Sequence, residues 1–83
     1  MIRFIPELVT VLWRLTRNGE QRSAEVFTHP HGLDLRAIVD GELLYGQVFQ
    51  ELADVVREAD ELRRLLEAQR WTEAVSPASE YGS

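Results

Sequence analysis

Residues 33–49 read LDLRAIVDGELLYGQVF, two runs of strand-favouring residues that meet at Asp40-Gly41. An Asp-Gly dipeptide accepts the positive φ angles of a type I′ turn, so this stretch predicts a β-hairpin with a two-residue loop. A loop of that length sets the register, pairing Val39 with Glu42, Ala37 with Leu44, and Leu35 with Gly46. Gly46 would then mark either a bulge or the close approach of another element.

Upstream, Asn18-Gly19 gives the same turn signal between residues 8–17, LVTVLWRLTR, and residues 20–28. The expected pairs are Leu15 with Arg22, Trp13 with Ala24, and Val11 with Val26. The turn from His29 to Gly32 joins this hairpin to the next, placing Val26 opposite Leu35 and Ala24 opposite Ala37. The three turns together predict a four-stranded antiparallel meander with one apolar face. That face should hold Val9, Val11, Trp13, Leu15, Ala24, Val26, Leu33, Leu35, Ala37, Val39, Leu44 and Val48.

Downstream, residues 50–70 contain no Gly or Pro, and their apolar residues recur at spacings of three and four. This pattern predicts an amphipathic helix that covers the apolar face, with Trp71 folding back to close the core. The expected fold class is α+β: a four-stranded antiparallel β-meander with one C-terminal α-helix packed on one face. We expect an N-terminal arm over residues 1–7, the single domain over residues 8–71, and a disordered tail over residues 72–83.

The amino-acid composition and net charge argue against several classes of function. The chain has 83 residues, 45% of them hydrophobic, no cysteine, and nine arginines against fourteen acidic residues, for a net charge of −5. This balance argues against general affinity for nucleic acid or an anionic membrane. Without cysteine, a membrane-length apolar run or a signal-like start, we expect a cytoplasmic protein. A core this small is marginally stable, so association with a second copy, giving a homodimer, is expected.

Catalytic motifs are absent from the sequence. His29 and His31, with Asp34 nearby, could form a metal site or an acid–base pair, but Pro30 and Gly32 already account for the turn. No Ser-His-carboxylate pattern or phosphate-binding loop occurs. We therefore expect no enzyme activity, no metal and no cofactor.

The second face of the predicted sheet supplies the functional hypothesis. About half of the residues on this face are apolar. Single exposed hydrophobic residues are normal on a protein surface, but a group of this size on one face is not. The alternative is a purely structural role, in which these side chains pack against one another and are present because their residue types favour strands. The favoured hypothesis is a non-catalytic module that self-associates or binds another protein by burying large side chains inside a charged rim. The residues expected to bind the partner are Leu12, Arg14, Glu25, Phe27, Arg36, Ile38, Leu43 and Tyr45.

Two resemblances bear on these hypotheses. The order of four strands and a helix resembles the Whirly and PUR-repeat group, which implies single-stranded nucleic-acid binding through Phe27, Tyr45, Arg14 and Arg36. The net charge and the neighbouring Glu25 and Asp34 oppose that alternative. Residues 39–49, with the helix ending in Gln69-Arg70-Trp71, resemble short bacterial proteins that carry a similar strand, Asp-Gly-Glu turn, strand and helix. That resemblance covers roughly residues 8–71 and implies the fold but no activity.

A third alternative places function on the outer side of the helix. An acidic protein of this size could be an antagonist or inhibitor that presents carboxylates to a basic partner, with Glu58, Glu61 and Glu80 as candidates. A charged helix face is more often simply solvated.

Overall fold

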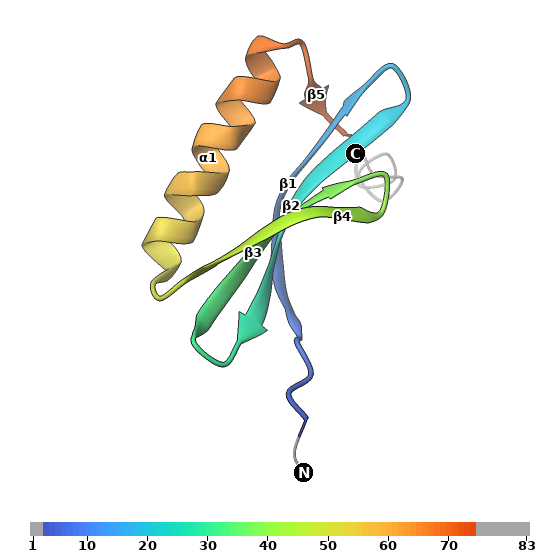
Figure 1. Cartoon of the computed structure of the whole chain (residues 1–83). Helices are drawn as coiled ribbons and strands as arrows, with labels where there is room; N and C mark the ends of the chain where they lie inside the picture. Colours follow the sequence, from blue (N-terminus) through green and yellow to red (C-terminus); the bar gives the residue numbers. More distant parts are fainter. Residues whose placement is uncertain (1–2, 75–83) are drawn as a thin grey trace, which may run out of the picture.

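A computed structural model describes residues 3–74 and shows an α+β fold with an antiparallel sheet, as predicted (Figure 1). The sheet has five strands in the order β4-β3-β2-β1-β5, one more than the sequence predicts. The helix α1 is slightly shorter than the expected 50–70. The elements are β1 (Leu8–Arg17), β2 (Glu20–His29), β3 (Gly32–Val39), β4 (Glu42–Phe49), α1 (Leu52–Ala68) and β5 (Thr72–Glu73).

The turn dipeptides adopt the predicted geometry. Asn18 and Gly19 have φ angles of 53° and 82°, and Asp40 and Gly41 have 50° and 84°. Two consecutive positive φ values define the type I′ turn, whose twist matches that of the strands it joins. The predicted pairs between each turn and the first bulge, such as Trp13 with Ala24, are therefore confirmed, as is the whole predicted β2–β3 register.

Away from the turns, β-bulges change the register, and three predicted pairs are wrong. In β1, Val9 and Leu12 are extra residues, so Val11 lies opposite Glu25 instead of Val26. In β4, Leu44 is extra. Each bulge places two residues opposite one and exchanges the faces of the side chains beyond it. The corrected β3–β4 pairs are Ala37 with Tyr45 and Leu35 with Gln47.

The core lies between the sheet and α1. Its cluster of buried side chains joins both layers and comprises Trp13, Leu15, Ala24, Val26, Leu35, Val55, Ala59, Leu66 and Trp71. The Nε1–H of Trp13 donates a 2.8 Å hydrogen bond to the backbone oxygen of Ala59, which ties β1 to the middle of the helix. We call the side of the sheet toward α1 the inner face and the opposite side the outer face.

The end of α1 brings Trp71 back to the core. Arg70 takes a left-handed φ of 71°, and the N–H of Trp71 donates to the oxygen of Leu66 at 3.1 Å while that of Arg70 donates to Glu67 at 3.0 Å. This pair of bonds is a Schellman motif, which reverses the chain and sets Trp71 against Leu66. The guanidinium groups of Arg17 and Arg22 each lie 4.9 Å from the Trp71 ring centre.

The two ends of the described chain both contact the sheet. Thr72 pairs with Thr16 and Glu73 with Leu15, so the expected disordered tail over 72–83 is wrong for its first residues; 75–83 lie outside the described part. At the other end, the N–H of Thr28 donates to Glu7 at 2.8 Å. No helix within residues 3–74 is long and apolar enough to cross a membrane.

Candidate protein interface

The outer face carries the candidate interface. Residues directly opposite in an antiparallel ladder point to the same side, so the register assigns its members. Among the described residues the only helix lies on the other side of the sheet (Figure 1). The outer face holds Leu8, Val11, Arg14, Ser23, Glu25, Phe27, Asp34, Arg36, Ile38, Leu43, Gly46 and Val48.

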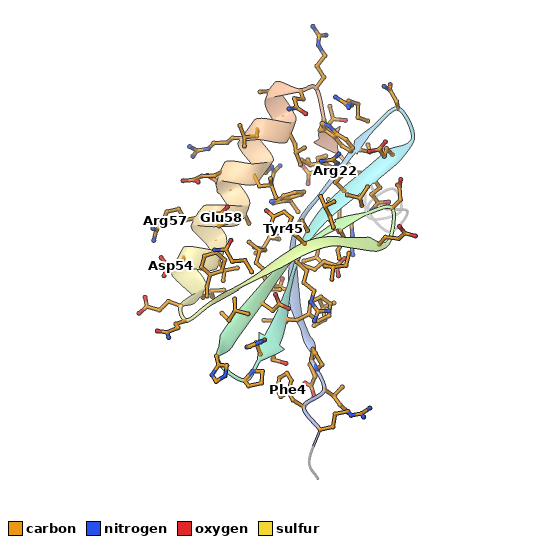
Figure 2. The ribbon with its side chains drawn as sticks, viewed as in Figure 1. Phe4, Arg22, Tyr45, Asp54, Arg57 and Glu58 are labelled. Atoms are coloured by element: carbon orange, nitrogen blue, oxygen red, sulfur yellow. The ribbon has the colours of Figure 1, made fainter. Side chains whose placement is uncertain are left out.

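Most of the predicted partner-binding residues lie on this face, but Leu12 and Tyr45 do not. The extra residues in β1 turn Leu12 toward the core cluster, against which it packs half-buried. The bulge at Leu44 puts Tyr45 opposite Ala37 on the inner face, where Figure 2 shows it between β4 and α1. The bulges bring Val11 and Val48 to the outer face in their place, and Leu8 lies there opposite Phe27. The residues correctly predicted there are Arg14, Glu25, Phe27, Arg36, Ile38 and Leu43.

At the centre of the outer face, an aromatic ring and an ion pair are already engaged with each other. The Arg36 guanidinium lies 4.2 Å from the centre of the Phe27 ring, and its Nε–H donates to Asp34 at 2.9 Å. Gly46 sits beside this group, and a Cβ atom there would lie 2.9 Å from an Asp34 carboxylate oxygen. The three side chains are partly buried, so the centre is a pre-ordered surface with little free charge.

A depression lies next to this centre. Ser23 is only 6% exposed and donates a 3.2 Å hydrogen bond to Glu25. The depression has a volume of about 200 Å³ and is lined by Arg14, Gln21, Ser23, Glu25, Ile38, Asp40 and Gly41. Arg14 is exposed and lines the depression together with the carboxylates of Glu25 and Asp40. The depression can therefore receive a small side chain and hydrogen-bond its polar end.

The margin of the outer face is apolar and open to solvent. Leu8 is 53% exposed and Leu43 is 59% exposed, at opposite ends of the face. Phe4 and Ile5 of the preceding segment are 46% and 73% exposed, and Figure 2 shows Phe4 at the end of the sheet where the chain enters it. The face thus combines a rigid, self-paired centre with exposed apolar edges.

The other candidate groups do not form a site with this surface. The His29 and His31 rings are 5.7 Å apart, and the His31 N–H donates to His29 Nδ1 at 3.0 Å, which stabilises the turn. Within residues 3–74, no group of three or more His, Cys, Asp or Glu side chains could hold a metal ion.

On α1, several acidic side chains are paired with arginines of the same helix. Asp54 and Arg57 are 2.6 Å apart, and both are labelled in Figure 2. Asp60 and Arg64 are 2.9 Å apart. Of the acidic candidates, Glu58 and Glu61 lie on this helix, and Glu80 lies outside the described residues.

Comparison of the chain with protein-family models, curated proteins and solved structures finds no match. The two resemblances stated from the sequence therefore stay predictions.

Proposed function

We propose that this chain is a small non-catalytic module that binds a protein partner, a second copy or another protein, through the outer face. The observation that supports it best is that Leu8, Phe27, Ile38 and Leu43 share a sheet face that no helix within residues 3–74 covers. Apolar groups gathered on one face of a monomer mark an interaction surface more often than a solvated one. A cytoplasmic location remains part of the proposal.

The size of the face suits a protein interface. Four strands spaced about 4.8 Å apart and about 27 Å long present roughly 500 Å² in projection, and more once the corrugated side chains are counted. A standard interface takes about 800 Å² from each partner. The apolar margin would supply the buried area, while Arg14 and Glu25 at the depression would orient the partner.

The occupied centre favours a protein over single-stranded nucleic acid. Stacking a base needs a free aromatic face, yet Arg36 covers the Phe27 ring at 4.2 Å. The same guanidinium is bonded to Asp34, which removes a phosphate contact. Nucleic-acid binding is therefore an outcome for the experiment to detect, through a steep loss of binding with salt.

The test is affinity capture from cell extract with the full chain as bait, followed by quantitative mass spectrometry after nuclease treatment. The outer-face variant Leu8→Glu with Phe27→Ala should lose the captured protein, whereas Val56→Glu, on an exposed helix position away from β4, should retain it. Circular dichroism checks that both variants remain folded. Equal capture by the two variants, or capture that depends on nucleic acid, would show that the outer face is not a protein interface.

A further inference from the structure

Strand β4 forms an open edge of the sheet. In the order β4-β3-β2-β1-β5, nothing within residues 3–74 pairs with its far side (Figure 1). Alternate residues of an edge strand direct their N–H and C=O groups away from the sheet, where they are ready to pair with another strand. The opposite edge differs, because β5 covers Leu15 and Thr16 of β1.

This open edge lacks the residues that usually protect one. Residues 43–49, LLYGQVF, contain no charge and no proline. Natural edge strands are commonly guarded by lysine, inward charge, proline or bulges, and here only the bulge at Leu44 is present. Leu44 is 59% exposed, Tyr45 39% and Val48 40%. An uncharged strand-forming segment of this length is suited to pairing with another strand.

We infer that β4 pairs with β4 of a second copy, antiparallel, about a two-fold axis at Gln47. The bulge at Leu44 ends the regular ladder, so the stretch free to pair is Tyr45–Phe49, and its midpoint is Gln47. In that register Tyr45 of one copy lies opposite Phe49 of the other on the inner face. On the outer face, Val48 lies opposite Gly46, which has no side chain to obstruct it. A two-fold contact must be self-complementary, and both pairings meet that condition.

The neighbouring inner surface fits the same occupant. A cleft of about 30 Å³ between β4 and α1 is lined by Trp13, Arg22, Ser23, Ala37, Ile38, Val39, Leu44, Tyr45, Leu62 and Leu66. Arg63 reaches Glu73 of β5 at 3.9 Å. At about 100° per residue, Leu65 lies on the other flank of α1, toward β4. Leu65 is 64% exposed, so an apolar strip extends from the open edge to the helix.

The second copy would cover this strip with the start of its own helix. Its Phe49 lies opposite Tyr45, and its α1 begins at Leu52, so its first helical turn reaches the level of Leu44. Leu52 is itself 52% exposed. The two sheets become one continuous sheet with both helices on the same side. Glu42 and Glu51 of different copies come near each other, so salt should strengthen the dimer by screening them.

This interface does not depend on the outer face, and each can fail alone. The first measurement is the solution mass of the full chain by sedimentation over a concentration series at low and high salt. We expect a monomer–dimer equilibrium that shifts toward the dimer with concentration and with salt. Gln47→Lys places two like charges opposite each other at the axis and should weaken the dimer by up to about fivefold at low salt. The matched control, Gln21→Lys at an exposed position of β2, should leave it unchanged.

A cross-link tests the register. The chain has no cysteine, and residues opposite themselves across an antiparallel axis have Cα atoms about 4.5–5.5 Å apart, within disulfide range. Gln47→Cys should therefore form a covalent dimer under mild oxidation. Leu43→Cys, on the same strand, should not, because its two copies would lie roughly 27 Å apart. A chain that stays monomeric throughout, or a dimer that cross-links equally at both positions, would overturn the proposal.

The outer-face variant separates this proposal from the previous one. Leu8→Glu with Phe27→Ala should leave the dimer mass unchanged while losing the captured partner. If that variant abolishes the dimer and Gln47→Lys does not, self-association uses the outer face and the pairing of β4 is wrong.

Discussion

Replacing each tryptophan by phenylalanine tests how the helix is held to the sheet. Both indoles are buried, Trp13 at 7% and Trp71 at 2% exposure, and both belong to the core cluster. They differ in one respect. The Nε1–H of Trp13 donates to Ala59 at 2.8 Å, whereas the buried Nε1 of Trp71 has no partner among the described residues. The same substitution therefore removes a hydrogen bond at one site and an unpaired donor at the other.

The difference in the free energy of unfolding can be worked out. Each substitution leaves a cavity of roughly 40 Å³, which at about 24 cal/mol per Å³ costs about 1 kcal/mol. Trp13→Phe also loses a hydrogen bond worth about 1 kcal/mol, although the Ala59 oxygen keeps its bond within the helix. Trp71→Phe instead removes a buried donor whose lack of a partner costs about 1–3 kcal/mol. We expect Trp13→Phe to be the more destabilising by about 2–4 kcal/mol.

Urea unfolding at one protein concentration measures this difference. The chain has two tryptophans, so each variant keeps one as a fluorescent probe, and circular dichroism supplies an independent signal. With a slope of about 1–3 kcal/mol per molar urea, the midpoints should differ by roughly 1 M or more. If Trp71→Phe costs as much as Trp13→Phe, the bond to Ala59 does not hold the helix to the sheet.

Two further predictions concern local features of the fold. Arg70→Gly should stabilise the protein by about 0.5–1 kcal/mol and raise the melting temperature by roughly 4 °C, because glycine adopts the left-handed conformation without a Cβ clash. An unchanged melting temperature would mean that the left-handed backbone conformation of Arg70 does not destabilise the protein. Leu12→Ala should destabilise by about 2 kcal/mol because the bulge turns Leu12 to the core, while Leu43→Ala, 59% exposed, should cost less than about 0.5 kcal/mol. Equal losses of stability in urea would contradict the bulge in β1.

The sequence predicts this sheet well where turn chemistry sets the register. Asn18-Gly19 and Asp40-Gly41 fix two-residue loops, and counting outward gives the correct pairs as far as the first bulge, to Trp13 with Ala24 in one hairpin and Ile38 with Leu43 in the other. The β2–β3 register is correct along its whole length because no extra residue interrupts either strand. The backbone preference of a turn dipeptide is therefore sufficient to predict these strand pairs.

The errors begin where a strand gains a residue. Two adjacent large apolar residues occur at Val11-Leu12 and again at Leu43-Leu44, and each pair breaks the alternation that a simple strand would show. Which residue of a pair is bulged depends on contacts with α1, and these are absent from a reading of one strand at a time. The short strand β5 was missed for a related reason. It depends on the reversal at Arg70, where glycine is the usual signal.

The bulge at Leu44 also divides association between two surfaces. Without it, Tyr45 would lie beside Phe27 and Leu43 on the outer face, and one aromatic surface would serve every partner. With it, Tyr45 lies on the inner face next to the open edge, and the outer face keeps Phe27 under Arg36. A dimer paired through β4 would leave both outer faces exposed on the same side of one sheet. A partner with two matching sites would then bind by avidity, so Gln47→Lys should weaken its capture without altering the outer face itself.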